Sequence, residues 1–161
     1  MVEKAPQKVK IKFPGDLEYI PAVRKYVSEM LQVNKFSPKF AFRSEIIVDE
    51  ICNNAVAYGC PSAESSVEVA CIMFTDRIEF QVKDSGGSTS DIKRLRELVA
   101  AEEEKGDSEK KPSPAGLGLE IVRLLSEEVD LEVDDNNLTS IRVVRRREDE
   151  PKNNKKKKLS K

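Results

Sequence analysis

Two neighbouring segments of the sequence constrain the fold most strongly. Residues 67–74 (VEVACIMF) and 77–83 (RIEFQVK) both alternate between polar and apolar side chains, and only Thr75 and Asp76 separate them. Alternation with a period of two is typical of strands that have one buried face, and so short a connection joins antiparallel neighbours. The sequence therefore predicts a β-hairpin within a sheet that a second layer covers.

The segment before the hairpin predicts a long and well-buried helix. Ser37 can cap this helix, Pro38 suits its first position, and Gly59 marks its end. The residues between them are almost continuously apolar, so the helix should be buried on most sides. A further helix is predicted over residues 16–32, where Pro21 should make the first turn irregular.

The remaining elements complete an α+β fold. Strands are predicted at 8–13, 129–133 and 138–144, and helices at 91–104 and from Gly116 onward, with a mobile segment at 105–115. This order predicts a two-layer sandwich in which helices cover one face of a mixed, mostly antiparallel sheet. We expect one domain over residues 8–147 and a disordered, lysine-rich tail over residues 148–161.

The composition excludes several classes of function. The 161 residues contain no histidine, so the chain has no His-dependent catalytic triad, no histidine–metal site and no phosphoacceptor histidine. No apolar run approaches the roughly 20 residues that a membrane helix needs, and the first residues lack the apolar stretch of a signal peptide. Cys52, Cys60 and Cys71 lack CxxC spacing. We expect them to be reduced, mainly structural thiols of a cytoplasmic protein.

The net charge of −1 conceals an uneven distribution of charge. Residues 151–161 hold six lysines and no acidic residue, whereas residues 1–150 carry 22 basic and 29 acidic residues. The lysine run at 155–158 has no aromatic neighbours, so a solvated tail is favoured over a specific nucleic-acid surface. Nonspecific binding to nucleic acid would depend strongly on salt. We expect neither membrane contact nor specific nucleic-acid binding.

Glu50 and Asn54 are the first candidates for a chemical role. They lie four residues apart, and therefore one turn apart, beside the apolar stripe of the predicted helix. An unpaired buried carboxylate is costly, so Glu50 needs a partner, a cleft or a metal ion, unless this flank simply emerges into solvent. Asp49 and Asn53 repeat the pattern one residue earlier but point further from the stripe.

Glycines concentrate at two places that suit a nucleotide. Four of the seven glycines lie at positions 86, 87, 116 and 118. Asp84 ends a strand just before the first pair and can offer a hydrogen-bond acceptor beside accessible backbone, although an ordinary turn would explain it too. Gly116 and Gly118 open a helix, whose free N–H groups and positive dipole end favour phosphate.

Taken in order, these motifs resemble the ATP-binding domain shared by gyrase, heat-shock chaperones, mismatch-repair proteins and sensor histidine kinases. The most similar branch is that of the bacterial anti-sigma factor serine kinases. DEICNNAVAYG resembles the N box of the family, VKDSGGS its first glycine box, and AGLGLEIVRLLSEEVDLEV its second glycine box with the following strand. The resemblance covers residues 10–145 and implies the Bergerat-type fold of that family and a homodimer.

The resemblance also implies roles for individual residues. Glu50 matches the general base that takes a proton from the substrate hydroxyl, and Asn54 matches the asparagine that binds Mg²⁺ at the phosphates of ATP. Asp84 matches the acid that accepts the adenine amino group. The other implied nucleotide contacts are Gly86 beneath the base, Gly116, Leu117 and Gly118 at the phosphates, Thr139 near adenine, and residues 87–115 as the lid. Arg24 matches a position near the contacts with partner proteins.

Two functions follow from these motifs. The first is an ATP-dependent serine-protein kinase and anti-sigma factor, which phosphorylates an antagonist protein of the STAS type and sequesters a sigma factor. The absence of histidine favours this function over that of a sensor kinase. The alternative is a catalytically inactive module that binds ATP or ADP and sequesters its partner.

Overall fold

The predicted hairpin lies inside a five-stranded sheet of the computed structural model, which describes residues 4–85, 93, 96–97, 117–136 and 138–147. The strands are β1 (Gln7–Pro14), β2 (Ser66–Met73), β3 (Arg77–Asp84), β4 (Glu128–Val133) and β5 (Thr139–Arg146). They are ordered β1-β2-β3-β5-β4, and each neighbouring pair is antiparallel. The predicted two-layer fold with a mostly antiparallel sheet is confirmed.

The β2–β3 hairpin forms at the predicted place. The N–H of Phe74 donates to the carbonyl of Arg77 at 2.9 Å and closes the turn, and Met73 pairs with Ile78. At the other end of the hairpin, Val67 pairs with Asp84. This register carries Asp84 to the end of the sheet where β5 begins, because β3 also pairs with β5.

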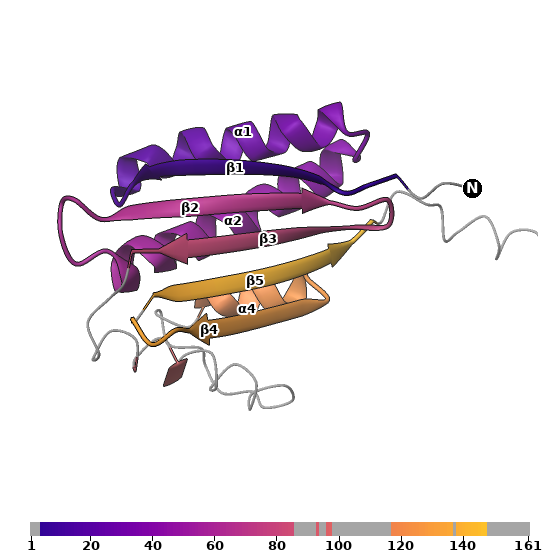
Figure 1. Ribbon diagram of the computed structural model, residues 1–161. Coiled ribbons are helices and arrows are strands. Elements are labelled where there is room, and N and C mark those ends of the chain that lie inside the picture. Colours follow the sequence, from indigo (N-terminus) through magenta and orange to yellow (C-terminus); the bar gives the residue numbers. More distant parts are fainter. Residues whose placement is uncertain (1–3, 86–92, 94–95, 98–116, 137, 148–161) are drawn as a thin grey trace, which may run out of the picture.

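The helices lie together on one face of the sheet (Figure 1). They are α1 (Ile20–Val33), α2 (Pro38–Gly59) and α4 (Leu117–Leu124), and the short 3₁₀ helix η1 (Leu17–Tyr19) precedes α1. The irregular first turn that Pro21 predicts is therefore a 3₁₀ turn. Ser37 caps α2 as predicted, since its hydroxyl accepts the N–H of Phe40 at 3.1 Å.

The connection between α1 and α2 is fixed by its backbone. The N–H of Phe36 donates to the carbonyl of Leu31 at 3.0 Å, and the N–H of Lys35 donates to that of Gln32 at 3.1 Å. This pattern ends a helix through one left-handed residue, and here that residue is Lys35, with a φ of 66°. The turn aims the start of α2 back along the sheet.

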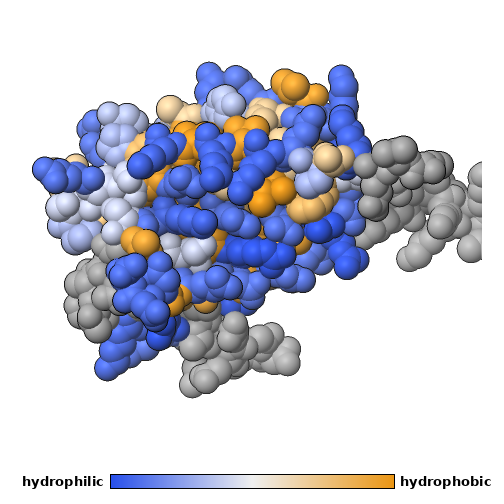
Figure 2. All heavy atoms as spheres, viewed as in Figure 1, coloured by the Kyte–Doolittle hydropathy of each residue, from blue (hydrophilic) through white to orange (hydrophobic). Residues whose placement is uncertain are grey.

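The core lies between the helices and the sheet, and the opposite face of the sheet is polar. Figure 2 shows that face as mostly hydrophilic, with smaller apolar patches. The fully buried core side chains include Val27, Leu31, Phe40, Ile47, Val48 and Ile51 from the helices, and Val67, Val69, Cys71, Ile78, Phe80 and Val143 from the sheet. This arrangement explains the apolar character of α2, which packs against α1, α4 and the sheet.

The three cysteines are unpaired thiols in the structure. Cys52 and Cys71 are buried, and Cys60 is half-buried. Burial raises the pKa of Cys52 and that of Cys71 to about 12, so neither forms a thiolate near neutral pH. Within the described part of the chain, no helix combines the length and the apolar character that crossing a membrane requires. The glycine–serine loop, most of the helix predicted at 91–104, and the tail lie outside the described residues.

Candidate functional site

Asp84 stands at the end of β3 with its side chain on the helix side of the sheet. The residue is 8% exposed, and its Oδ1 accepts the backbone N–H of Thr139 at 3.2 Å. Thr139 is the first residue of β5 and is itself 3% exposed. The structure thus brings together two residues that the sequence separates by 55 positions.

Gly59, the last residue of α2, forms the wall against which Asp84 packs. A Cβ atom at position 59 would lie 2.0 Å from Asp84 Oδ2 and 2.5 Å from Asp84 Cβ, so only glycine fits here. The sequence marked Gly59 merely as the end of a helix. Its contact with Asp84 is tertiary, and no local signal in the sequence could have indicated it.

The turn before Thr139 is held in place by Asp134. The Asp134 Oδ1 atom accepts the N–H groups of Asn136 and Leu138, each at 2.9 Å. The Asp134 N–H donates to the carbonyl of Leu138 at 3.0 Å. These three bonds fix the backbone that presents the Thr139 N–H to Asp84.

Two acid–amide pairs on α2 differ in their contacts. Asp49 Oδ1 accepts from Arg24 Nη1 at 3.0 Å, and the Asn53 amide donates to the Asp49 carbonyl at 2.6 Å. Glu50 and Asn54 are also half-buried, but they make no side-chain hydrogen bond or ion pair to any residue that the structure describes. The first pair therefore has structural contacts, and the second pair retains its polar groups for other partners.

The amide of Asn54 is incompletely bonded in a buried position. Its Nδ2 atom is buried and has no hydrogen-bond partner among the described residues. Buried polar groups are nearly always hydrogen-bonded, so this amide fits a site that a polar ligand completes. In the described part of the chain, no group of three Cys, Asp or Glu side chains is placed so that it could hold a metal ion. A Mg²⁺ ion at Asn54 would then take its other ligands from phosphate and water, as this ion commonly does.

Glu50 is electrostatically suited to accept a proton. Burial raises the pKa of its carboxyl, and the neighbouring charge of Asp49 raises that pKa further. A carboxylate with a raised pKa is a stronger base than an ordinary exposed one, provided that the pH keeps it ionised. The side chain is half-buried, so a substrate group can still reach it.

The glycine motifs are described only in part. Gly118 lies in the first turn of α4, which begins at Leu117 and packs against α2. The predicted helix start after Gly116 is therefore present. Gly86 and Gly116 lie outside the described residues, and so does the side chain of Leu117.

Arg24 lines a groove between α1 and α2. The groove has a volume of about 620 Å³, and its lining is Pro21, Arg24, Lys25, Phe42, Glu45, Ile46 and Asp49. Phe42 is 61% exposed, which leaves much of a large aromatic ring on the surface of α2. The ion pair between Arg24 and Asp49 joins the two helices across this groove.

Arg145 is a residue that the sequence did not single out. It is 1% exposed, and its guanidinium donates to the carbonyls of Leu125 and Phe40 and to the hydroxyl of Ser44. The same group stacks over the Phe40 ring at 4.0 Å. Arg145 thus ties the start of α2 to the residue that follows α4. In the sequence, Arg145 is a basic residue at the start of a charged segment, and this pattern does not predict a buried side chain.

Comparisons with known proteins agree with this geometry. The model of the histidine kinase-like ATPase domain family matches residues 13–145. The chain is 29% identical over 135 residues to the serine-protein kinase RsbW of Bacillus licheniformis, and this alignment covers 83% of each protein. It is 23% identical over 125 residues to RsbW of Bacillus cereus, and that alignment covers 78% of this chain and 77% of the Bacillus cereus protein.

A solved structure has the same fold. The crystal structure of the SiaB–SiaC complex from Pseudomonas aeruginosa contains a chain that matches with a TM-score of 0.65 and 20% sequence identity. The match covers 83% of this chain and 88% of that chain. It confirms the two-layer architecture over nearly the whole described part.

Proposed function

Because the chain belongs to the histidine kinase-like ATPase domain family, we propose that it is an ATP-dependent serine-protein kinase that also acts as an anti-sigma factor. The similarity to RsbW, a serine-protein kinase, supports kinase activity. The observation that carries the proposal is the contrast on α2: Asp49 and Asn53 are engaged by hydrogen bonds, whereas the side chains of Glu50 and Asn54 make no hydrogen bond or ion pair with the described residues.

The nucleotide lies, in this proposal, between the Asp84 end of the sheet and α2. Asp84 accepts the adenine amino group, with Thr139 and Gly86 beside the base. Gly116, Leu117 and Gly118 offer backbone N–H groups to the phosphates at the start of α4. Support comes from the burial of Asp84 against Gly59, which leaves a fixed acceptor at the base of the site.

The chemical step is a phosphoryl transfer that needs mainly positioning. Asn54 would hold Mg²⁺, and the bound ion would supply positive charge that neutralises the phosphates of ATP. Glu50 accepts the proton of a serine hydroxyl as its oxygen bonds to the γ-phosphorus and the bond from that phosphorus to the ADP oxygen breaks. The products are phosphoserine, ADP and a proton, held first by Glu50.

We further propose that partners dock on the groove between α1 and α2. Arg24, paired with Asp49, lies there beside the exposed ring of Phe42, and this combination of charged and apolar groups suits a protein surface of mixed character. The expected partners are a sigma factor and a STAS-type antagonist that carries the substrate serine. A homodimer, a cytoplasmic location and domain limits at 8 and 147, with a separate tail over 148–161, are further parts of this proposal.

The test is direct. The protein is incubated with Mg-ATP and a STAS-type antagonist, and phosphoserine on the antagonist is measured by mass spectrometry. Nucleotide binding is measured in parallel by calorimetry. We expect both signals. Binding without phosphoserine would support the alternative of an inactive sequestering module, and absence of nucleotide binding would overturn both functions.

A further inference from the structure

Helix α1 exposes apolar side chains along its outer side. Four of the seven large hydrophobic residues that are exposed in the described part of the chain lie on η1 and α1, and they are Leu17, Tyr19, Tyr26 and Val33. Single exposed apolar residues are ordinary on a protein surface, but a group of them on one element is typical of an interaction site. Figure 1 shows α1 at the outer edge of the helix layer, and Figure 2 shows apolar groups along this edge of the molecule.

Three of these residues form one stripe. Tyr19, Tyr26 and Val33 are 46%, 49% and 77% exposed, and each is seven residues from the next. Seven residues make almost two turns of an α-helix, so the three side chains lie on the same side of α1 over a length of about 21 Å. Ala22, one turn from both tyrosines, is also exposed and widens the stripe. The α1 residues that reach the core, such as Val27, lie on a different side of the helix.

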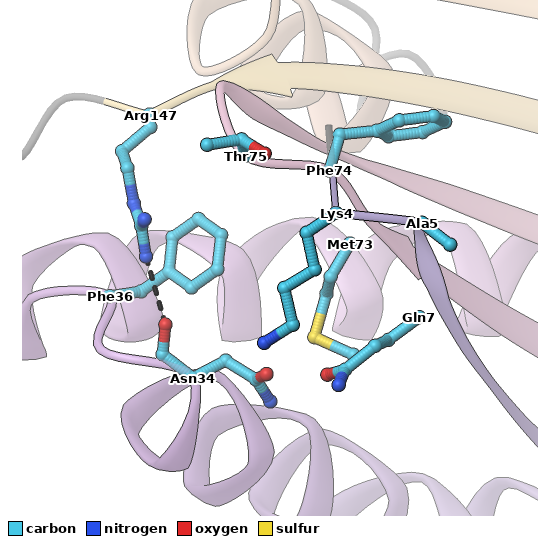
Figure 3. Close-up of a pocket in the computed structure, with 9 residues that line it drawn as sticks. All are labelled: Lys4, Ala5, Gln7, Asn34, Phe36, Met73, Phe74, Thr75 and Arg147. Atoms are coloured by element: carbon cyan, nitrogen blue, oxygen red, sulfur yellow. Dashed lines mark hydrogen bonds between the residues drawn. The ribbon is translucent and has the colours of Figure 1, made fainter. Parts of the chain in front are cut away.

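The helix that carries the stripe is held firmly in place. At its end, the Asn34 amide donates to the carbonyl of Met30 at 2.9 Å. Figure 3 shows the Arg147 guanidinium donating to the carbonyl of Asn34, and this distance is also 2.9 Å. In its middle, Arg24 pairs with Asp49 of α2 at 3.0 Å. A surface that is already fixed loses little conformational freedom when it binds a partner.

The spacing of the stripe fits a second copy of this chain. Tyr19 and Val33 lie equally far from Tyr26 along the sequence, one on either side. When two α1 helices pack antiparallel about a two-fold axis at Tyr26, the two Tyr26 rings meet, and Tyr19 of each copy meets Val33 of the other. Each large side chain of the stripe then has an apolar counterpart. A two-fold contact is closed, so it produces a dimer and no longer assembly.

The charges near the stripe agree with this arrangement. Lys25 and Glu29 are exposed beside it, and neither has an ion pair with a described residue. The two-fold axis brings Glu29 of one copy within about one turn of Lys25 of the other, so opposite charges approach each other twice. An antiparallel dimer through the edge strand β1 would instead place Lys8, Lys10 and Lys12 opposite the same lysines, which is unfavourable.

We propose that this stripe is the surface through which two copies of the chain form a dimer, with Tyr26 at the two-fold axis. The inference rests on the homodimer of the proposed function and names the surface that forms it. Four stripe residues per copy are far fewer than the roughly 20 residues that each partner contributes to a standard interface. We therefore expect a dimer that dissociates on dilution into the micromolar range.

The first test measures self-association by sedimentation over a range of concentrations, without nucleotide. We expect the wild type to change from monomer to dimer as its concentration rises. Tyr26→Glu should weaken the dimer by at least about tenfold, because two carboxylates would meet at the axis. Phe42→Glu makes the same aromatic-to-acid change on α2, outside the stripe, and should leave dimerisation within about twofold. Thermal unfolding checks that both variants are folded.

The second test determines the register by cross-linking with a short bis-maleimide. Cys60→Ser removes the half-buried thiol, and the two other cysteines are buried. In this background, Tyr26→Cys should form cross-linked dimers by itself. Tyr19→Cys and Val33→Cys should cross-link to each other in a mixture but only weakly when alone, because equal positions then lie about 21 Å apart. Ala57→Cys, at an exposed position of α2, is the control and should not cross-link.

Several results would overturn the proposal. They are a monomer even at millimolar concentration, equal effects of Tyr26→Glu and Phe42→Glu, and cross-linking of Val33→Cys alone that is as strong as in the mixture. A dimer that Tyr26→Glu leaves intact would also overturn it, although the homodimer itself would stand. Phosphoserine on the antagonist is measured separately, so failure of the proposed kinase activity is distinguishable from failure of this surface.

Discussion

Replacing Gly59 by alanine should disrupt the close contact between α2 and Asp84 in the candidate site. The added Cβ would lie 2.0 Å from Asp84 Oδ2 and 2.5 Å from Asp84 Cβ. Rotation of the carboxylate relieves the first overlap but not the second. The end of α2 and the end of β3 must therefore move apart, and Asp84 must leave the N–H of Thr139.

The change in the free energy of unfolding has three contributions, two of which destabilise the variant and one of which stabilises it. Overpacking of a filled site costs about 1–3 kcal/mol, and loss of the Thr139 hydrogen bond costs about 1 kcal/mol. Alanine otherwise favours a helix over glycine by about 0.5–1 kcal/mol. The net loss of about 1–3.5 kcal/mol should lower the unfolding midpoint by roughly 3–12 °C for a domain of this size.

The assay combines thermal unfolding with calorimetric titration of ATP. We expect Gly59→Ala to unfold at a lower temperature and to bind ATP about tenfold more weakly, which is about 1.4 kcal/mol. Ala57→Gly, at an exposed position of the same helix, changes helix preference without touching Asp84 and serves as the matched control. An unchanged or higher midpoint in Gly59→Ala, together with unaltered ATP affinity, would show that the contact between Gly59 and Asp84 does not shape the nucleotide site.

Three further predictions follow from other residues. The rate of phosphorylation should fall as the pH drops through the raised pKa of Glu50, because the proposed base must be ionised. A pH profile of the rate, measured where the protein stays folded, checks this prediction. A rate that stays constant down to the ordinary pKa of glutamate would contradict it. A thiol reagent at pH 8 should modify Cys60 first in the folded protein, because Cys52 and Cys71 are buried and have pKa values of about 12. After denaturation it should modify all three cysteines. Mass spectrometry of the labelled peptides measures this order, and early labelling of Cys52 would contradict the structure. Arg145→Met should lower the free energy of unfolding by about 3–5 kcal/mol, because it leaves buried carbonyls without their donor. Urea denaturation measures this loss. A change below about 1 kcal/mol would contradict the structural role of Arg145.

Local patterns in the sequence predicted the elements of the fold. The hairpin turn at Thr75 and Asp76, the cap at Ser37 and the irregular turn near Pro21 all rest on interactions between residues close in the sequence. Such interactions leave a readable pattern. The charged segment at 91–104 is amphipathic as well, but most of it lies outside the described residues.

The contacts within the candidate site could be predicted only in part. Helical projection placed Glu50 and Asn54 nearer the apolar stripe than Asp49 and Asn53, but it could not show that Arg24 pairs with Asp49, because that contact joins two helices. The proximity of Asp84 and Gly59 and the burial of Arg145 also depend on how the layers pack. These features have no local signature, so the sequence alone did not indicate them.

The proposed function depends most on Glu50 acting as the base of a serine kinase. The most direct test measures phosphoserine on a STAS-type antagonist in single turnovers, with wild type, Glu50→Gln and Glu132→Gln. Glu132 is exposed on β4 and outside the proposed site, so its variant controls for the loss of one charge. We expect Glu50→Gln to bind ATP normally but to transfer phosphate at least about a hundredfold more slowly, and Glu132→Gln to behave as wild type. Phosphoserine formed at the wild-type rate by Glu50→Gln would contradict it.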